Sequence, residues 1–274
     1  MTNNAASLQT PLPFTTTDPP SVVDQYGRQL RYIRVSVTDV CNLSCHYCNP
    51  VKGCGSLHPH KLSWDDLDFL VDVCANELGV EAIRITGGEP TVRPGLAGWI
   101  RGIRRHESIT NVAMTTNALR LSAIAPELAR AGLDRVNISL DSLDPENFRD
   151  VTRGGRLDRC LAGIDTARRH FRPVKINSVL LRGFNAPAEL ERFLEFSDAS
   201  GLEVRFIELM PLFDAKEYFH RHFFSVEEAI DALRARGHEL VPEGDGAAEG
   251  NTTGYGPATT FRVAGTRARL GFIS

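Results

Sequence analysis

Three cysteines fall within eight residues of this chain, at Cys41, Cys45 and Cys48, directly after a β-branched run over residues 31–37. Thiolates are soft ligands that select zinc or iron–sulfur clusters. Three closely spaced thiolates without a nearby fourth ligand leave one metal position open, and a cluster iron not bound by cysteine can bind a small molecule there. The spacing therefore predicts a metal or cluster site. A structural zinc knuckle and buried, inert cysteines are the alternatives.

A second motif lies downstream, where a β-branched stretch over residues 82–86 runs into Gly87, Gly88, Glu89 and Pro90. Glycine permits close approach of the backbone to a ligand, and proline ends strand pairing. We therefore predict a loop at a strand end that exposes backbone groups and one carboxylate. Alone, this motif would be an ordinary turn more often than a binding site.

Together, the Cys-x3-Cys-x2-Cys loop and the Gly-Gly-Glu-Pro loop resemble the pair of motifs that defines radical S-adenosylmethionine (SAM) enzymes. In that family the three cysteines bind a 4Fe-4S cluster, and the methionyl amine and carboxylate of SAM chelate the remaining iron. The Gly-Gly-Glu-Pro backbone holds the amine. An electron from the cluster then yields a 5′-deoxyadenosyl radical, which abstracts hydrogen from the substrate. The resemblance implies both cofactors and an external electron donor.

Composition sets broad limits on the kind of protein. With 274 residues, of which 42% are hydrophobic, the chain can bury a substantial core. A net charge of −3 gives no nucleic-acid signature. We expect a cytoplasmic protein without membrane contact, because no apolar run approaches a membrane span and no secretion signal begins the chain. The other cysteines, Cys54, Cys74 and Cys160, show no pairing pattern and are expected to be structural.

Short β-branched runs alternate with segments of helical spacing, which predicts βα units with right-handed crossovers. The expected fold class is α/β, an incomplete (βα)6 partial TIM barrel of the radical SAM type with ligand sites at the C-terminal strand ends. The predicted domains are a flexible tail (1–24), the partial barrel (25–237) and a truncated C-terminal β extension (238–274), which begins with a loop at 242–255 and ends in a hairpin. Strands are predicted at 31–37, 82–86, 112–116, 135–140, 174–181 and 204–210, and helices at 64–78, 94–105, 122–131, 157–170, 188–200 and 226–236.

Over residues 28–274 the chain resembles the GTP 3′,8-cyclase family of molybdenum-cofactor biosynthesis. The matching motifs lie in order at 30–39, 115–117, 132–144, 174–177 and 205–211. Enzymes of that family abstract the ribose 3′ hydrogen of GTP and join C3′ to guanine C8, giving 3′,8-cyclo-7,8-dihydro-GTP. The resemblance makes Cys41, Cys45 and Cys48 cluster ligands, places Tyr47, Gly87, Gly88, Glu89, Ser139 and Met210 around SAM, and turns Arg34, Arg84, Thr115 and Lys175 toward the nucleotide.

Physical chemistry gives these residues two interpretations each. Arg34, Arg84 and Lys175 sit in otherwise apolar strands, so they either face a triphosphate in one cavity or pair with carboxylates; the ligand is favoured. A methionine ending an apolar strand, as Met210 does, is usually core filler, and strand hydroxyls such as Ser139 are common. Hydrogen abstraction by a radical needs no protein acid or base, so no catalytic side chain is predicted.

The resemblance has two departures. Family members bind a second 4Fe-4S cluster, which contacts guanine, through three cysteines of a C-terminal segment. These 274 residues hold no second such set, so we expect one cluster in this chain. The other departure is Ala118, where the family usually has glycine, which restricts that turn.

The sequence therefore leaves two hypotheses about function. One is a cyclase-type enzyme acting on GTP or a related nucleoside triphosphate. The other is a degenerate or repurposed relative that binds cluster and SAM but acts on another substrate or none. A zinc-binding structural domain is a more distant third reading. Either of the first two could act as a homodimer.

Overall fold

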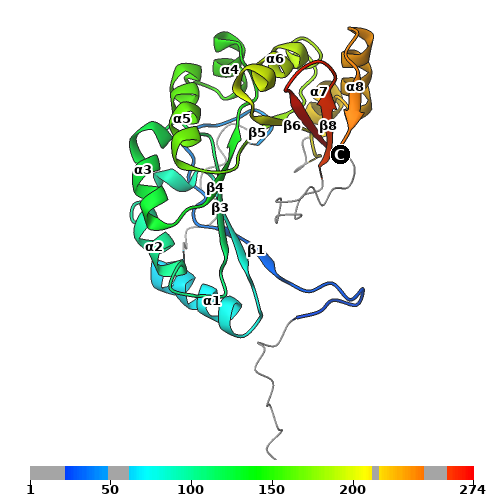
Figure 1. The fold of residues 1–274 in the computed structure, drawn as a ribbon. Coiled ribbons are helices and arrows are strands. Elements are labelled where there is room, and N and C mark those ends of the chain that lie inside the picture. Colours follow the sequence, from blue (N-terminus) through cyan, green and yellow to red (C-terminus); the bar gives the residue numbers. More distant parts are fainter. Residues whose placement is uncertain (1–21, 49–61, 212–215, 244–257) are drawn as a thin grey trace, which may run out of the picture.

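The fold is a curved, open sheet with helices along its outer side (Figure 1). The computed structural model describes residues 22–48, 62–211, 216–243 and 258–274, so Cys54, most of the predicted tail and most of the loop at 242–255 lie outside the described residues. Within these ranges the strand order is β1-β2-β3-β4-β5-β6-β9-β8-β7. The strands are β1 (Tyr32–Ser36), β2 (Ala82–Thr86), β3 (Asn111–Thr116), β4 (Arg135–Ser139), β5 (Val174–Val179), β6 (Glu203–Ile207), β7 (Leu240–Pro242), β8 (Thr259–Val263) and β9 (Arg269–Ile273).

Strands β1 to β6 are parallel neighbours in chain order, which confirms the six βα units of a partial barrel. The predicted hairpin is also present, since β8 and β9 pair antiparallel. The parallel pairing of β9 with β6 was not predicted, and it makes the hairpin a continuation of the barrel sheet. The helices are α1 (Trp64–Asn76), α2 (Leu96–Ile103), α3 (Leu121–Ala131), α4 (Pro145–Val151), α5 (Leu157–His170), α6 (Leu190–Ser200), α7 (Lys216–His222) and α8 (Val226–Ala235), with a 3-10 turn η1 (Pro90–Val92).

Local signals explain where several helices begin and end. Ser63 and Asp66 form the reciprocal capping box that the sequence predicts for α1. Gly132 and Gly201 take the left-handed conformation that ends α3 and α6. The short helices α4 and α7 were not predicted, because seven residues are too few to establish a helical period. No helix in the described ranges is long and apolar enough to cross a bilayer.

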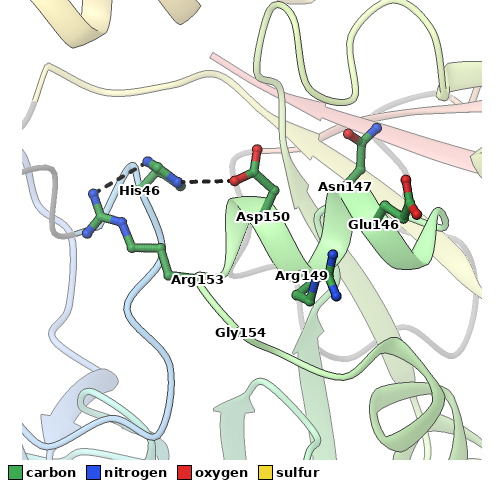
Figure 2. A pocket seen from close by; sticks show the side chains of 7 residues that line it. All are labelled: His46, Glu146, Asn147, Arg149, Asp150, Arg153 and Gly154. Carbon is green, nitrogen blue, oxygen red and sulfur yellow. Dashed lines mark hydrogen bonds and ion pairs between the residues drawn. The ribbon is translucent and has the colours of Figure 1, made fainter.

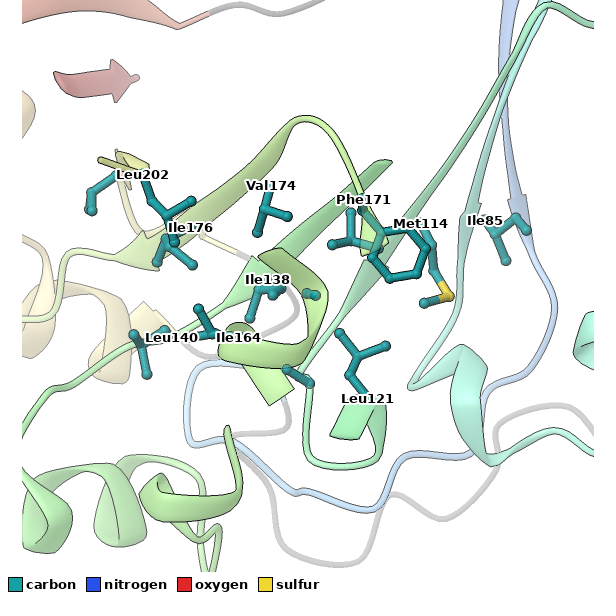
Figure 3. Packing of buried hydrophobic residues seen from close by; sticks show 14 of the residues in the cluster. Ile85, Met114, Leu121, Ile138, Leu140, Ile164, Phe171, Val174, Ile176 and Leu202 are labelled. Atoms are coloured by element: carbon teal, nitrogen blue, oxygen red, sulfur yellow. The ribbon is translucent and has the colours of Figure 1, made fainter. Parts of the chain in front are cut away.

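The two faces of the sheet differ in chemistry because side chains alternate along each strand. One face buries aliphatic residues against the helices, and Figure 3 shows Ile138 and Ile176 from this face packed near Ile164 of α5. The opposite face, called the concave face below, is polar because the alternate positions carry charges, hydroxyls and amides. Its residues include Tyr32, Arg34, Arg84, Thr115, Arg135, Asn137, Ser139, Lys175, Asn177, Glu203 and Arg205. Parallel strands thus direct one polar surface toward their common C-terminal ends.

Gly163 of α5 is required by close packing against the turn that precedes α3. A Cβ atom at Gly163 would lie 2.2 Å from the carbonyl oxygen of Ala118. That carbonyl also accepts a hydrogen bond from the amide of Leu121 at 3.0 Å, so it cannot turn away without loss. The absence of a side chain at Gly163 therefore sets the distance between the two helices.

We expect Gly163→Ala to lower the free energy of unfolding by about 1–3 kcal/mol, the usual cost of overpacking. The sign of this change in the free energy of unfolding is informative, because replacing glycine by alanine inside a helix normally stabilises a protein by about 1 kcal/mol. Gly98→Ala in α2 is the matched control, since Gly98 is exposed and its nearest neighbour lies 3.8 Å away. Denaturant unfolding of both variants measures the difference. Equal stabilisation by both substitutions would contradict the close approach of α5.

Candidate functional site

The cysteine loop follows β1 and rests on the backbone of the Gly-Gly-Glu-Pro loop, which follows β2. The amide of Gly88 donates to the carbonyl of Thr38 at 2.6 Å, and the amide of Glu89 donates to that of Val40 at 2.9 Å. Cβ atoms at Gly87 and Gly88 would lie 2.4 Å from the Thr38 oxygen and 2.5 Å from the Val40 oxygen. Both glycines are therefore needed for two backbones to meet, which joins the two predicted motifs directly.

The far side of the cysteine loop is anchored to the end of α4. The amide of Ser44 donates to the carbonyl of Thr152 at 3.3 Å, and that of His46 to the carbonyl of Val151 at 2.9 Å. The hydroxyl of Tyr47 donates to the carboxylate of Asp141, which follows β4, at 2.8 Å. The three-cysteine loop is thus held from β2, β4 and α4, although its own residues form no regular element.

The three thiols stand on one short loop, with Cys41 and Cys48 exposed and Cys45 half-buried. Burial raises the pKa values of all three thiols, so isolated thiolates are disfavoured and a cationic partner would be needed to stabilise them. Among the described residues, no three His, Cys, Asp or Glu side chains converge closely enough for a single metal ion. In a 4Fe-4S cluster three cysteines each bind a different iron, and the three thiols of this loop supply that donor set.

Glu89 corrects one prediction, because its carboxylate is not displayed at the loop surface. The side chain is 1% exposed and accepts hydrogen bonds from Thr91, from the hydroxyl of Thr116 at 2.7 Å and from the amide of Asn117 at 2.7 Å. Asn117 in turn donates through its side chain to Asn42 at 2.8 Å. The buried carboxylate therefore links the ends of β2 and β3 and, through Asn117, steadies the cysteine loop.

Asp141 lies within the matching motif at 132–144, and the sequence analysis assigns it no role. Burial raises the pKa of this carboxyl to about 6, although hydrogen bonds from the amide of Val179 and the hydroxyl of Tyr47 oppose the rise. The carboxyl thus fixes the orientation of Tyr47 next to Cys48. Its signal in the sequence was an acid directly after an apolar strand, at the edge where parallel strands end.

The turn after β3 contains the departure at Ala118. Its backbone lies at φ 62°, in the left-handed region where alanine costs roughly 1–2 kcal/mol relative to an ordinary conformation. The amide of Ala118 donates a hydrogen bond to the hydroxyl of Thr116 at 3.1 Å, and this bond lies within the same turn. The turn therefore keeps a glycine-like conformation despite the alanine, and the expected restriction is present as backbone strain.

A polar pocket of about 620 Å³ lies beside the cysteine loop, between His46 and the helix α4 (Figure 2). Its lining is Glu146, Asn147, Arg149, Asp150, Arg153 and Gly154 besides His46. His46 contacts Asp150 at 3.8 Å and Arg153 at 3.4 Å. Charges of both signs line the pocket, so it favours neither an anion nor a cation.

Arg34 and Arg84 come together on the concave face, as predicted. They are register partners on β1 and β2, and both Nε atoms donate to the hydroxyl of Tyr32, at 3.2 and 2.7 Å. Arg84 is buried, Arg34 is exposed, and neither forms an ion pair with a carboxylate of the described residues. The phenol orients two like charges side by side, an arrangement suited to one shared anion. Sequence spacing missed Tyr32, because a tyrosine in a strand is usually a packing residue.

Lys175 differs from the two arginines. In the ligand-free protein it pairs with a carboxylate, which was the less favoured of its two interpretations. Its Nζ lies 3.0 Å from Glu203, which also contacts Arg205 at 2.5 Å, and all three side chains are largely buried. Burial lowers the pKa of Lys175, while Glu203 opposes that change. A carboxylate therefore already neutralises this cation, and Glu203 and Arg205 were not among the predicted site residues.

We expect Glu203→Gln to lower the free energy of unfolding by about 3–5 kcal/mol, because it leaves two buried cations without their counter-charge. Denaturant unfolding of this variant and of Lys175→Met with Glu203→Gln forms the test. The double variant should recover part of the loss, since only Arg205 then lacks a partner. Additive losses in the double variant would argue against a coupled pair.

Two solved structures share this fold. Streptococcus suis SuiB has a TM-score of 0.60 at 15% identity, covering 76% of this chain and 46% of that one. Native anSMEcpe with bound AdoMet and Kp18Cys peptide has a TM-score of 0.60 at 17% identity, covering 74% of this chain and 58% of that one. At these identities the likeness concerns the fold alone.

Fold and site together define the class of protein. The Radical SAM superfamily model matches residues 35–197, so the chain is a member of that superfamily. A GTP 3′,8-cyclase of Hydrogenovibrio crunogenus is 39% identical over 258 residues, covering 93% of this chain and 76% of the relative. One of Heliobacterium modesticaldum is 40% identical over 255 residues, covering 92% and 76%. The chain belongs to the GTP 3′,8-cyclase family.

Proposed function

We propose that this protein is a radical SAM enzyme that converts GTP to 3′,8-cyclo-7,8-dihydro-GTP in molybdenum-cofactor biosynthesis. One observation carries the proposal beyond family membership. The cysteine loop is docked on the Gly87-Gly88 backbone at the strand ends, on a sheet whose concave face holds Arg34 and Arg84 without carboxylate partners among the described residues. A cluster site and an anion site thus occupy one sheet.

The cofactor half of the site is assigned as follows. Cys41, Cys45 and Cys48 would bind the 4Fe-4S cluster, which together with SAM supplies the 5′-deoxyadenosyl radical when both are bound. The backbone of Gly87 to Glu89 would hold the methionyl end of SAM, while the buried Glu89 carboxylate keeps that backbone in place. Tyr47, Ser139 and Met210 would line the remaining SAM surface.

Met210 supports this assignment of the SAM site. The side chain follows β6 and is 61% exposed, which a core filler would not be. An exposed thioether at a C-terminal strand end is available to a ligand. Because the radical itself breaks the substrate C–H bond, the protein's contribution is to position the reactants and to exclude water.

The substrate half assigns the triphosphate to Arg34 and Arg84, with Thr115 and Lys175 as further contacts. Among the described residues, Tyr32 engages only the Nε atoms of these guanidinium groups, which leaves their Nη donors for a phosphate. Lys175 would share its charge between Glu203 and the nucleotide. An external one-electron donor is also required, and a homodimer is a further arrangement open to this enzyme.

Equilibrium binding of GTP and the yield of 5′-deoxyadenosine test the proposal. GTP should bind and should increase SAM cleavage by the reduced, reconstituted protein. Arg84→Met should weaken GTP binding roughly 10- to 100-fold, whereas Arg130→Met on the exposed surface of α3 should not. GTP that neither binds nor changes 5′-deoxyadenosine formation would point instead to a relative with another substrate.

A further inference from the structure

Arg135 is a buried arginine on the concave face that neither motif identifies. It begins β4, and its side chain lies opposite to those of Val136 and Ile138, which are in the hydrophobic core. Its Cα register partner on β3 is Ala113, which is also the partner of Arg84 on β2. Arg84 and Arg135 therefore stand at the same level of the sheet with only a small side chain between them.

Within the described part of the chain, the surroundings of Arg135 give its charge no ion-pair partner. The residue is 5% exposed, and its Nε atom is buried without a hydrogen-bond partner. The adjacent carboxylate, Asp134, is engaged by the side chain of Arg104 and by the amide of Val112. Glu203, the acid on β6, pairs with Lys175 and Arg205. No carboxylate of the described residues forms an ion pair with Arg135.

Such an arrangement is costly in the ligand-free protein. A buried charge without an ion-pair partner loses its hydration and gains little Coulomb attraction in return. Burial lowers the pKa of Arg135, the like charge of Arg84 lowers it further, and Tyr32 and Asp134 oppose this change only in part. Buried, uncompensated charges of this kind cluster at functional sites, where a ligand of opposite charge provides the missing partner.

We propose that Arg135 binds a phosphate group of the substrate nucleotide together with Arg84. This inference rests on the proposed function and extends its anion site across the sheet, from β1 and β2 to the first residue of β4. Arg34, Arg84 and Arg135 then offer guanidinium donors to one polyphosphate from three strands. The remaining cations of the face, Lys175 and Arg205, are held by Glu203.

The binding test compares GTP, guanosine and inorganic triphosphate on the wild-type protein and on Arg135→Met. The variant should bind GTP and triphosphate roughly 10- to 100-fold more weakly, with guanosine binding unchanged. Arg135→Lys should recover only part of the affinity, because an ammonium group lacks the bidentate fork. Arg130→Met, an exposed arginine of α3, is the matched control and should bind all three ligands as the wild type does.

A second readout separates ligand binding from a structural role. Without nucleotide, Arg135→Met should unfold at a higher temperature than the wild type, because it removes an uncompensated buried charge. A triphosphate concentration that saturates the wild type should raise its unfolding temperature, and the same concentration should raise that of the weaker-binding variant much less. A structural arginine would give the reverse, a lower unfolding temperature or no folding in the ligand-free variant, and would overturn the inference.

The outcomes distinguish this inference from the proposed function. Wild-type protein that binds GTP while Arg135→Met binds it equally well overturns only the role of Arg135. Wild-type protein that binds neither GTP nor triphosphate overturns the proposed function and this inference with it. Selective loss of phosphate-dependent binding in Arg135→Met, with SAM cleavage retained in the absence of nucleotide, supports both.

Discussion

Cys45→Ala is expected to abolish the 4Fe-4S cluster and, with it, SAM cleavage. Cys45 is the most buried of the three thiols and lies between the other two in sequence, so its substitution removes the central sulfur ligand of the loop. The wild-type chain should hold about four irons and four sulfides after anaerobic reconstitution, because its one three-cysteine set binds one cluster. Iron and sulfide analysis, together with the electron paramagnetic resonance signal of the reduced protein, measures the loss.

Cys74→Ala provides the matched control for this experiment. Cys74 is also a half-buried cysteine, but it lies on α1 away from the loop and should leave iron content and SAM cleavage unchanged. Zinc binding in place of iron and sulfide would favour a structural zinc domain. A full cluster in Cys45→Ala, or about eight irons in the wild-type chain, would show that the ligand assignment is wrong.

Gly88→Ala is expected to reduce SAM cleavage roughly 100-fold, the effect of displacing a reacting group by about 1 Å. The new Cβ would lie 2.5 Å from the Val40 oxygen and 2.8 Å from that of Asp39. Backbone atoms cannot rotate away as a flexible side chain can, so the cysteine loop must move. Cluster content and SAM affinity should fall together, because one contact positions both.

Gly98→Ala serves as the control here as well, since a Cβ at that exposed position meets nothing closer than 3.8 Å. Unfolding measurements on Gly88→Ala show whether the fold is retained while the loop shifts. A folded Gly88→Ala variant with normal cluster content and normal SAM cleavage would contradict the role of this close approach.

Much of the barrel was predictable because its strands are β-branched and its helices are amphipathic. The predicted helix at 157–170 matches α5, and the predicted strand at 82–86 matches β2. The pairing of β9 with β6 was not predictable in this way, since it joins segments far apart in the chain. Alternation within strands does not by itself specify which later segment completes a sheet edge.

For the site, too, the sequence predicts the residues that belong to local motifs but not those that long-range contacts bring together. Cysteine spacing and the glycine pair identify the cluster loop, because those residue types at that spacing have few other uses. Long-range partners such as Asp141 and Glu203 carry no motif, and only the fold brings them to Tyr47 and Lys175. The exposed Glu89 carboxylate was a wrong prediction, because sequence shows that an acid is present in a loop but not which way it points.

GTP carrying deuterium at the ribose 3′ carbon tests most directly whether this protein abstracts the 3′ hydrogen of GTP. The anaerobically reconstituted, reduced protein is incubated with SAM and this substrate, and the 5′-deoxyadenosine is analysed by mass spectrometry. We predict transfer of deuterium into 5′-deoxyadenosine, dependent on Cys45 and weakened by Arg84→Met. Formation of 5′-deoxyadenosine without deuterium, or of none at all, would contradict the assignment of this chain as an enzyme acting on GTP.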